Sequence, residues 1–197
     1  MPANAVCTLT DSTVGEDVTV HEGAYFQATN TDIGGRVRAY SAGTLFIDSD
    51  STVARYVKST GTAQVFVFNA TVGSGLEIDG TTEVVQLCGN TFTRGDVKVL
   101  RSGLDILVGS SDAVVDCGGN TVSDGDLELR RNVTDVEFIA SGNTVSKDLE
   151  VYDNSGPVEK TITDNVGGDE LECFGNEEPV VATGNTFARP LGQCVEV

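Results

Sequence analysis

The feature that most constrains the fold is a short motif that recurs about every 20 residues: a polar residue, a threonine and an apolar residue. The clearest copies are Asn90-Thr91-Phe92, Asn120-Thr121-Val122, Asn143-Thr144-Val145 and Asn185-Thr186-Phe187. With weaker copies included, the apolar anchors fall near positions 14, 33, 53, 72, 92, 122, 145, 166 and 187. Their spacings are 19, 20, 19, 20, 30, 23, 21 and 21 residues. Such self-similarity indicates a solenoid, in which each repeat buries its apolar side against its neighbours.

Inside each repeat the apolar residues alternate with polar ones. Val18 and Val20 follow the first anchor, and Leu127 and Leu129 follow a later one. This period of two is that of a half-buried strand, and no segment has a helical period. A further strand precedes the next motif, for example at residues 24–28, 65–67 and 136–140. We therefore predict an all-β fold: one domain over residues 1–197, a right-handed parallel β-helix (β-solenoid) of about nine coils with three short strands each.

The coil between the anchors Phe92 and Val122 is about ten residues longer than its neighbours. We place the extra residues in an insertion within 101–111. Insertions on a solenoid tend to project from one side and often serve function, whereas simple drift in coil length is the alternative.

The asparagine and threonine of the motif predict two columns. Asparagine tolerates left-handed backbone at a coil corner, and its amide can bond to the asparagines of the coils above and below. The threonine beside it is expected to point outward. A threonine ladder also raises ice binding as a minor functional alternative, through Thr13, Thr52, Thr71, Thr91, Thr121, Thr144 and Thr186.

The charge of the chain excludes some partners. Thirty acidic residues stand against 12 basic ones, for a net charge of −18, so a nucleic acid partner is not expected. No stretch approaches the roughly 20 apolar residues of a membrane span, so membrane insertion is not expected either. The first residues lack the pattern of a signal peptide, and we expect Met1-Pro2 to open a trimmed mature chain.

Both ends of the sequence resemble a known family. The chain closes with Leu171-Glu172-Cys173, then Gly184-Asn185-Thr186-Phe187, then Gly192-Gln193-Cys194, and it opens with Cys7-Thr8-Leu9-Thr10. These segments are similar to an uncharacterised family of secreted bacterial β-helix repeat proteins, with Asn-Thr-Val coils and a Leu-x-Cys … Gly-Gln-Cys ending. The resemblance implies the fold and export. It implies no catalytic residues, and the middle of the chain departs from the pattern.

The five cysteines suggest disulfides and one remaining thiol. Cys173 and Cys194 each lie seven residues after an anchor, so they are expected to stack in adjacent coils and to form a bridge. Cys88 and Cys117 also lie one coil apart, and either a bridge or two buried thiols fits their positions. Cys7 has no obvious partner. A zinc site is not expected, because the sequence has no Cys-x-x-Cys and a single histidine.

Acidic side chains follow three consecutive coils at matching positions. Two columns are expected, from Asp126, Glu128, Asp148, Glu150, Glu170 and Glu172. Stacked carboxylates repel one another, and a divalent cation would reverse that repulsion, so calcium is the candidate ion. The alternative is a solvated acidic face that binds no metal, and no other cofactor is expected.

Three observations favour association with another molecule. The same strand position carries Arg36, Arg38 and Lys58 near the N-terminus, so the face runs from basic to acidic and a staggered or antiparallel neighbour could pair with it. The run containing Phe66 and Phe68 is apolar on both faces, and we expect Ile47 beside Phe66. The predicted coils have no capping helix, and open β-helix ends offer unpaired strands. A homo-oligomer or fibre is therefore expected, with an extracellular protein or a glycan as other partners.

The sequence favours a secreted or cell-surface structural or interaction protein without catalysis. The alternative is a polysaccharide-active lyase or hydrolase, which rests on the fold class alone. An enzyme would need paired carboxylates in a groove. The sequence shows no such pair outside turn-like segments and no Ser-His-Asp set, because its only histidine is His21.

Overall fold

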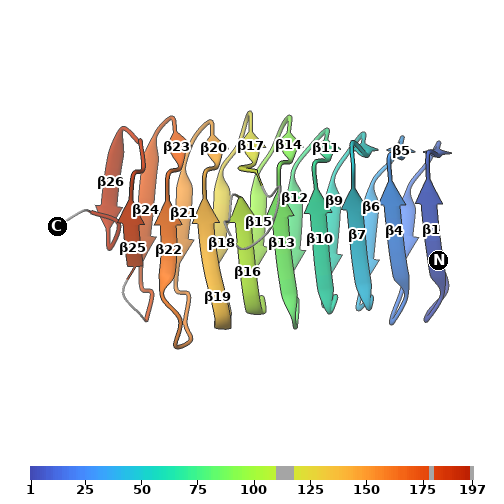
Figure 1. Cartoon of the computed structure of the whole chain (residues 1–197), viewed down its shortest axis with the longest axis horizontal. Coiled ribbons are helices and arrows are strands. Elements are labelled where there is room, and N and C mark those ends of the chain that lie inside the picture. The colour runs from blue at the N-terminus through green and yellow to red at the C-terminus, as the bar shows by residue number, and fades with distance from the viewer. Residues whose placement is uncertain (110–117, 178–179, 196–197) are drawn as a thin grey trace.

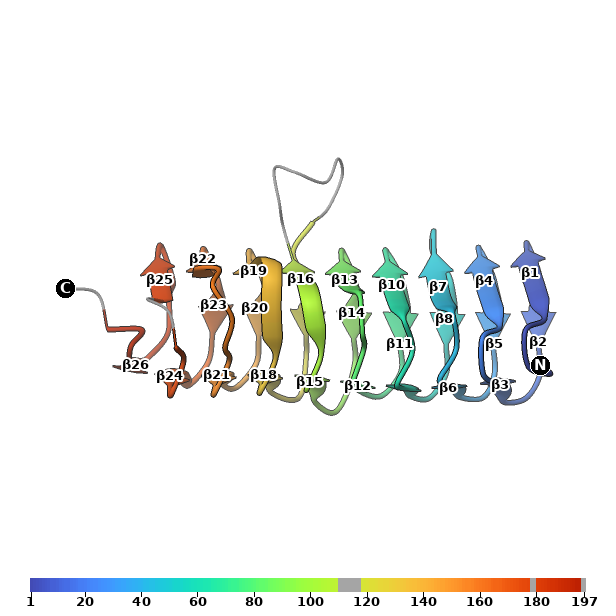
Figure 2. The same cartoon turned by 90° about the horizontal axis from the view of Figure 1, so that it is seen from below.

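The computed structural model describes residues 1–109, 118–177 and 180–195. These residues form strands and turns, and none belongs to a helix that could cross a membrane. The strands make three parallel sheets, A, B and C, which together form a β-solenoid of about nine turns. Figure 1 shows the coils side by side, with the two termini at opposite ends, and Figure 2 shows the same stack from below. The prediction of an all-β parallel solenoid is confirmed.

Each coil contributes one strand to each sheet over most of the chain. Sheet A contains β1 (Val6–Thr10), β4 (Tyr25–Thr29), β7 (Thr44–Asp48), β10 (Gln64–Phe68), β13 (Val84–Cys88), β16 (Gly103–Gly109), β19 (Val133–Ser141), β22 (Lys160–Thr163) and β25 (Val180–Thr183). Sheet B contains the two-residue strands β2 (Thr13–Val14), β5 (Asp32–Ile33), β8 (Thr52–Val53), β11 (Thr71–Val72), β14 (Thr91–Phe92), β17 (Thr121–Val122), β20 (Thr144–Val145) and β23 (Val166–Gly167). Sheet C contains β3 (Val18–Val20), β6 (Val37–Tyr40), β9 (Val57–Thr60), β12 (Leu76–Asp79), β15 (Val97–Leu100), β18 (Leu127–Arg130), β21 (Leu149–Tyr152), β24 (Glu170–Phe174) and β26 (Arg189–Gly192).

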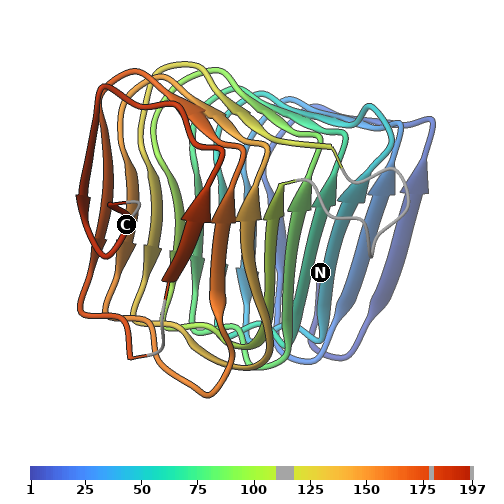
Figure 3. The same ribbon diagram turned by 60° about the vertical axis from the view of Figure 1, so that its left-hand side comes forward.

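The core is a stack of aliphatic side chains that the alternation of each strand turns inward. In β12, Leu76 and Ile78 are buried whereas Glu77 lies outside, and Leu76 pairs with Val97 of the next coil. Because the register between most neighbouring strands is straight, like residues stack on like residues. Figure 3 shows the course of the backbone around the interior of the solenoid. Lys160 is an exception. It takes the inward place beside Phe138, and its Nζ donates to the carbonyl oxygens of Gly156 and Val158 at 2.9 and 2.8 Å.

At four of the five corners between sheets A and B that carry a ladder asparagine, the residue just before the asparagine has left-handed backbone. Gly89, Gly142 and Gly184 have φ values of 66°, 67° and 68°, and Asp164 has a φ of 55°. The sequence had assigned this conformation to the asparagine itself. The structure places it one residue earlier, which turns the asparagine side chain inward, where it is buried.

The inward asparagines form a continuous hydrogen-bonded ladder along the solenoid axis. Asn120 Nδ2 donates to the Leu87 carbonyl at 2.8 Å and to Asn143 Oδ1 at 2.9 Å. Its Oδ1 accepts from the backbone N–H and from Nδ2 of Asn90, at 3.1 and 2.9 Å. Each inner member therefore satisfies both of its amide N–H groups and accepts twice, as a buried amide must. The members of this ladder are Asn90, Asn120, Asn143, Asn165 and Asn185.

A second ladder, which we did not predict from the sequence, lies at the corner between sheets C and A. Asn132 donates to Asn154 Oδ1 at 2.9 Å, and Asn154 donates to Asn176 Oδ1 at 3.0 Å. Gln193 ends the series, because its longer side chain brings Oε1 within 3.0 Å of the backbone N–H and of Nδ2 of Asn176. A left-handed residue again precedes each asparagine, for example Gly175 with a φ of 68°.

Two predicted positions differ from the structure. The anchor Val166 lies outside and is 47% exposed, because it pairs with Thr144, while Gly167 pairs with the anchor Val145. The Phe187 ring lies against Gly167 and fills the inward place. Of the insertion range 101–111, residues 103–109 form strand β16 of sheet A. This strand pairs in register with β13 from Asp105 to Val108, and its register with β19 shifts between Leu104 and Asp105. Residues 110–111 lie outside the described residues.

Candidate functional site

The outer surface of sheet C gathers most of the charged residues that the sequence singled out. We call it the C face, and we number its coils 1 to 9 by the strands β3, β6, β9, β12, β15, β18, β21, β24 and β26. Its central column, from coil 1 to coil 9, reads Thr19, Arg38, Lys58, Glu77, Lys98, Glu128, Glu150, Glu172 and Leu191. The leading column, two residues earlier, reads Asp17, Arg36, Tyr56, Gly75, Asp96, Asp126, Asp148, Glu170 and Arg189. The trailing column, two residues later, reads Tyr40, Thr60, Asp79, Leu100, Arg130, Tyr152 and Phe174 from coil 2 to coil 8.

Aspartates of the leading column accept hydrogen bonds from the backbone of the next coil. Asp96 Oδ1 accepts from the Asp126 N–H at 3.2 Å, Asp126 Oδ1 from the Asp148 N–H at 3.2 Å, and Asp148 Oδ1 from the Glu170 N–H at 2.7 Å. Burial opposes the ionisation of Asp96, but bonds from Lys98 and from the Asp126 backbone outweigh it and lower its pKa. These carboxylates therefore help to hold successive coils in register.

The six carboxylates proposed for calcium do form two columns over coils 6 to 8, and cations lie among them. Glu128 bonds to Lys98, Arg130 bonds to Glu150, and Arg189 of the last coil bonds to Glu170. Desolvation nevertheless raises the pKa of Glu150, against the lowering effect of Arg130. Within the described part of the chain, no group of three or more His, Cys, Asp or Glu side chains is arranged to hold a metal ion.

The basic end of the C face is built around Tyr56. Arg38 Nε donates to Tyr56 Oη at 3.1 Å and Arg36 Nη1 donates at 3.3 Å, with the guanidinium carbons 5.7 and 5.5 Å from the ring centre. These hydrogen bonds, first from Arg36 and then from Arg38, lower the pKa of Tyr56. Arg36 also pairs with Asp17 at 3.0 Å. Lys58 lies in the same coil as Tyr56, and its Nζ lies 2.8 Å from Glu77 of the next coil, a hydrogen bond that raises the pKa of Lys58.

The C face is basic near the N-terminal end of the rod and acidic near the C-terminal end. Coils 2 and 3 present Arg36, Arg38 and Lys58, and coils 7 and 8 present Asp148, Glu150, Glu170 and Glu172. The predicted change from a basic to an acidic end is therefore present on one continuous face. Beside the acidic end, Tyr152 and Phe174 stack with ring centres 5.8 Å apart, and the Arg130 guanidinium lies 4.6 Å from the Tyr152 ring centre.

The outer face of sheet A carries the aromatic residues. Phe66 and Phe68 point outward and are half-buried, and they meet Phe46 with ring centres 5.8 and 5.7 Å away. The neighbour of Phe66 is thus Phe46 and not Ile47 as predicted. Ile47 pairs with Val67 and is fully buried, because the alternation of β7 turns it into the core.

A pair of acids on the same face was not foreseen. Asp105 and Glu137 are neighbours in the register of β16 and β19 and point outward. Burial raises the pKa of Asp105, and burial together with the charge of Asp105 raises the pKa of Glu137. Asp105 Oδ1 is buried and accepts no hydrogen bond from the described residues. No sequence signal pointed to this pair, because the two residues stand 32 positions apart in coils of unequal length.

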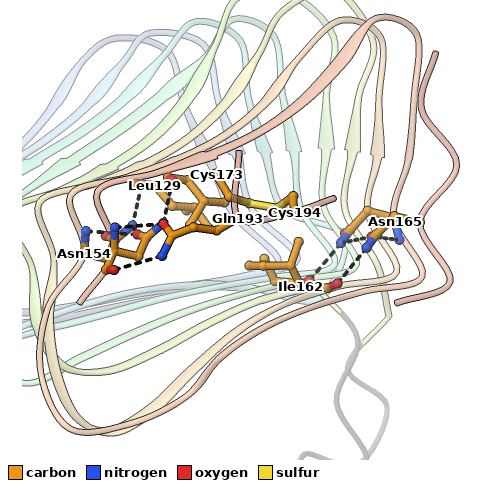
Figure 4. The surroundings of a disulfide bond; sticks show 11 residues. Leu129, Asn154, Ile162, Asn165, Cys173, Gln193 and Cys194 are labelled. Carbon is orange, nitrogen blue, oxygen red and sulfur yellow. Dashed lines mark hydrogen bonds between the residues drawn. A yellow bond between two sulfur atoms is a disulfide. The ribbon is translucent and has the colours of Figure 1, made fainter. Parts of the chain in front are cut away.

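Cys173 and Cys194 form a disulfide, with their Cα atoms 5.2 Å apart, as their spacing had predicted. Figure 4 shows the bond between the two ladders, with Asn154 and Gln193 on one side and Asn165 on the other. It ties β24 to the segment after β26. Cys7 is a half-buried free thiol.

The second proposed pair falls partly outside the described residues. Cys88 is 2% exposed, packs against Leu107 and takes part in a disulfide. Cys117 lies outside the described residues, so its pairing with Cys88 stays a prediction.

Comparisons of the chain with protein-family models, with curated proteins and with solved structures found no match in any of the three. Function must therefore be inferred from the residues described above.

Proposed function

We propose that this protein is a structural or interaction protein without catalysis, a β-helical rod that associates through its charged C face. The division of charge along this face supports the proposal. Clustered cations at one end and clustered anions at the other favour a partner with the complementary arrangement, and such complementarity sets orientation and association rate. Because the pairs are partly exposed, the association is expected to weaken as salt is added.

We also propose that the protein acts outside the cytoplasm. Disulfides persist in oxidising surroundings, and the Cys173–Cys194 bond fits such a setting. Membership of the secreted β-helix family, proposed from the motifs at both ends of the chain, points the same way. Calcium is not part of the proposal, because cations of the chain itself lie among the six acids.

Native mass in solution tests the association. Multi-angle light scattering on a sizing column, at low and at high salt and over a range of concentrations, is expected to give more than one chain per particle at low salt. High salt is expected to return the mass to that of one chain. A single-chain mass at low salt and high concentration would overturn the proposal.

Asp105 and Glu137 favour a second candidate, a polysaccharide-active enzyme. They are adjacent carboxyls on strands about 4.8 Å apart, with raised pKa values and aromatic residues on the same face. Paired carboxyls about 5 Å apart are the arrangement of retaining glycosidases. The test is to incubate the protein with a panel of glycans and to measure the reducing ends that are released. Release by the unaltered protein that is lost in Asp105→Asn would favour this candidate over the first. If no glycan in the panel is cleaved, the enzyme candidate is excluded.

A further inference from the structure

We infer that the partner of the C face is a second copy of this chain, lying antiparallel to the first, so that coil 1 of each copy faces coil 9 of the other. This inference rests on the proposed function and names its partner. The dyad axis would run parallel to the strands at coil 5, so every contact between unlike coils would occur twice.

Antiparallel full overlap places opposite charges against each other in all three columns. In the central column, Arg38 of one copy meets Glu172 of the other, and Lys58 meets Glu150. In the leading column, Arg36 meets Glu170 and Asp17 meets Arg189. In the trailing column, Asp79 meets Arg130, Tyr40 meets Phe174 and Leu100 meets its own copy.

Each like-charge contact of this arrangement has an opposite charge of the same chain beside it, and Lys58 and Glu150 would meet across the dimer while keeping their own partners Glu77 and Arg130. Glu77 would face Glu128, but Glu77 pairs with Lys58 at 2.8 Å and Glu128 pairs with Lys98. At coil 5, Lys98 and Asp96 would each face their own copy, and the two are paired within the chain at 3.0 Å. Lys98 can therefore reach the Asp96 of the other copy as well as its own.

The shape of the face agrees with the same arrangement. Gly75 has no side chain in the leading column, and it lines a hollow together with the cations Lys58 and Lys98 and the acids Glu77 and Asp96. In the proposed dimer, Asp126 of the other copy lies over this glycine. A second hollow receives Asp79 and Thr60 of the other copy, and it is lined by Leu100, Tyr152, the cations Arg101, Arg130 and Arg131 and the acids Glu128 and Asp153. Each entering carboxylate would thus find a cation in its hollow, with acids of the same chain beside that cation.

Other ways of joining two C faces fit less well. A parallel arrangement would set Lys58 against Lys58, Glu150 against Glu150 and Glu172 against Glu172. An antiparallel arrangement shifted by one coil would match Lys58 with Glu128, but it would set Asp17 against Glu170 and leave coil 9 uncovered. The full overlap covers every coil.

The size of the face predicts a weak dimer. Nine strands about 4.8 Å apart give a length of about 40 Å, and three columns span about 13 Å, so each copy covers roughly 500 Å². This is near the lower limit of specific interfaces, which bury about 1,000 Å² in total. We therefore expect a dimer that dissociates on dilution and in salt.

Charge reversal with rescue tests both the orientation and the register. Lys58→Glu alone and Glu150→Lys alone each create two like-charge contacts, and each variant is expected to sediment as a monomer at low salt where the unaltered protein is a dimer. An equimolar mixture of the two variants is expected to recover the dimer, as a heterodimer in native mass spectrometry. In that heterodimer the two substituted positions face each other with opposite charges, and the unaltered Lys58 of one copy faces the unaltered Glu150 of the other.

Matched charge controls and folding checks accompany the reversals. Arg94→Glu and Glu83→Lys change exposed residues outside the three columns, and they are expected to leave the dimer intact. Far-UV circular dichroism and thermal melting establish that each variant is folded.

The outcomes separate this inference from the proposed function. If the unaltered protein is a monomer under all conditions, the proposed function and the inference both fail. If it associates but both reversals leave association unchanged, the C face is not the interface: the inference and the assignment of association to the C face both fail, and only the association itself stands. Rescue of Lys58→Glu by Glu128→Lys in place of Glu150→Lys would overturn the full-overlap register.

Crosslinking at the dyad gives a second readout. Leu100 meets its own copy, so Leu100→Cys in a Cys7→Ser background is expected to be joined into a covalent dimer by a short bismaleimide. A maleimide linker is needed because faces that pack about 10 Å apart are too distant for a direct disulfide. Thr60→Cys, two coils away on the same column, is the control and is expected to react far less. Equal crosslinking of both variants would contradict the dyad at coil 5.

Discussion

Asn90 Nδ2 donates a 2.9 Å hydrogen bond to Oδ1 of Asn120, a residue 30 positions further along the chain and one coil away in space. The Asn90 backbone N–H donates to the same oxygen at 3.1 Å. One buried side chain thus satisfies polar groups of two coils, and the pattern repeats along the ladder. Because an unsatisfied buried polar group costs about 1–3 kcal/mol, the ladders make each coil depend on its neighbours.

Asn120→Ala is expected to reduce the free energy of unfolding by about 3–4 kcal/mol. The change leaves the amide and the backbone N–H of Asn90, as well as the Leu87 carbonyl, without the partner they have now, and each loss adds to the cost. Urea denaturation followed by circular dichroism measures it. The control is Thr121→Ala, the adjacent outward residue, which is expected to cost less than about 1 kcal/mol. Equal effects of the two substitutions would contradict the structural role of the ladder.

Removing the disulfide through Cys194→Ala is expected to destabilise the last coil more than the rest of the rod. The bond closes a loop of 21 residues, for which the chain-entropy model gives about 3 kcal/mol. Hydrogen exchange is expected to increase in β24 and in the following residues while β10 keeps its protection, because a solenoid coil contacts only its neighbours. A uniform increase along the chain would contradict this local effect.

Gly167→Ala is expected to cost about 1–3 kcal/mol, because a Cβ atom there would overlap the Phe187 ring. Gly15→Ala is the control, since Gly15 directly follows the sheet B strand β2 and a Cβ atom added to it would have nothing within 4 Å. Thermal melting compares the two. The double substitution Gly167→Ala with Phe187→Ala is expected to cost less than the sum of the single ones. Strict additivity would mean that the two residues do not share the space.

Asp105 and Glu137 are expected to make the protein more stable in mild acid. Their pKa values are raised in the folded state, so the folded protein binds more protons than the unfolded chain between the ordinary and the raised values. Their contribution to stability is full below pH about 4 and is lost as the pH rises through the raised values. At neutral pH, Asp105→Asn is expected to increase the free energy of unfolding by roughly 0.5–1 kcal/mol. The exposed Asp169→Asn serves as the control, and a destabilising Asp105→Asn would contradict the sign.

The solenoid could be predicted from the sequence because each coil repeats the same outward and inward pattern. Thr91 and Phe92 define one strand of sheet B, and their counterparts recur in almost every coil. Where the motif weakens, the register becomes ambiguous by one residue. The likeness of Asp164-Asn165 to the motif predicts Val166 as an anchor, whereas the ladder aligns Asn165 with Asn143 and moves Val166 outside. The same one-residue ambiguity led to the prediction of Ile47 as the neighbour of Phe66, whereas the neighbour is Phe46.

The second ladder could have been found from Gly175-Asn176, which repeats the Gly-Asn pair of the first ladder. Its other asparagines follow Arg131 and Asp153, which have left-handed backbone here although neither is glycine. The C face was foreseen in part, as two acidic columns and a basic end. The interleaving of Lys98, Arg130 and Arg189 depends on the register between coils of unequal length, which spacing alone does not give.

Small-angle X-ray scattering at low salt tests the central claim, association through the side of the rod, most directly. One rod of nine stacked strands is about 40 Å long. Lateral pairing of two C faces is expected to double the mass while the longest dimension changes little and the cross-section grows. Addition of salt is expected to return the mass and the cross-section to the values of a single rod. A particle of twice the mass and about twice the length, stable in salt, would mean that the coil ends join the copies, and it would contradict the account.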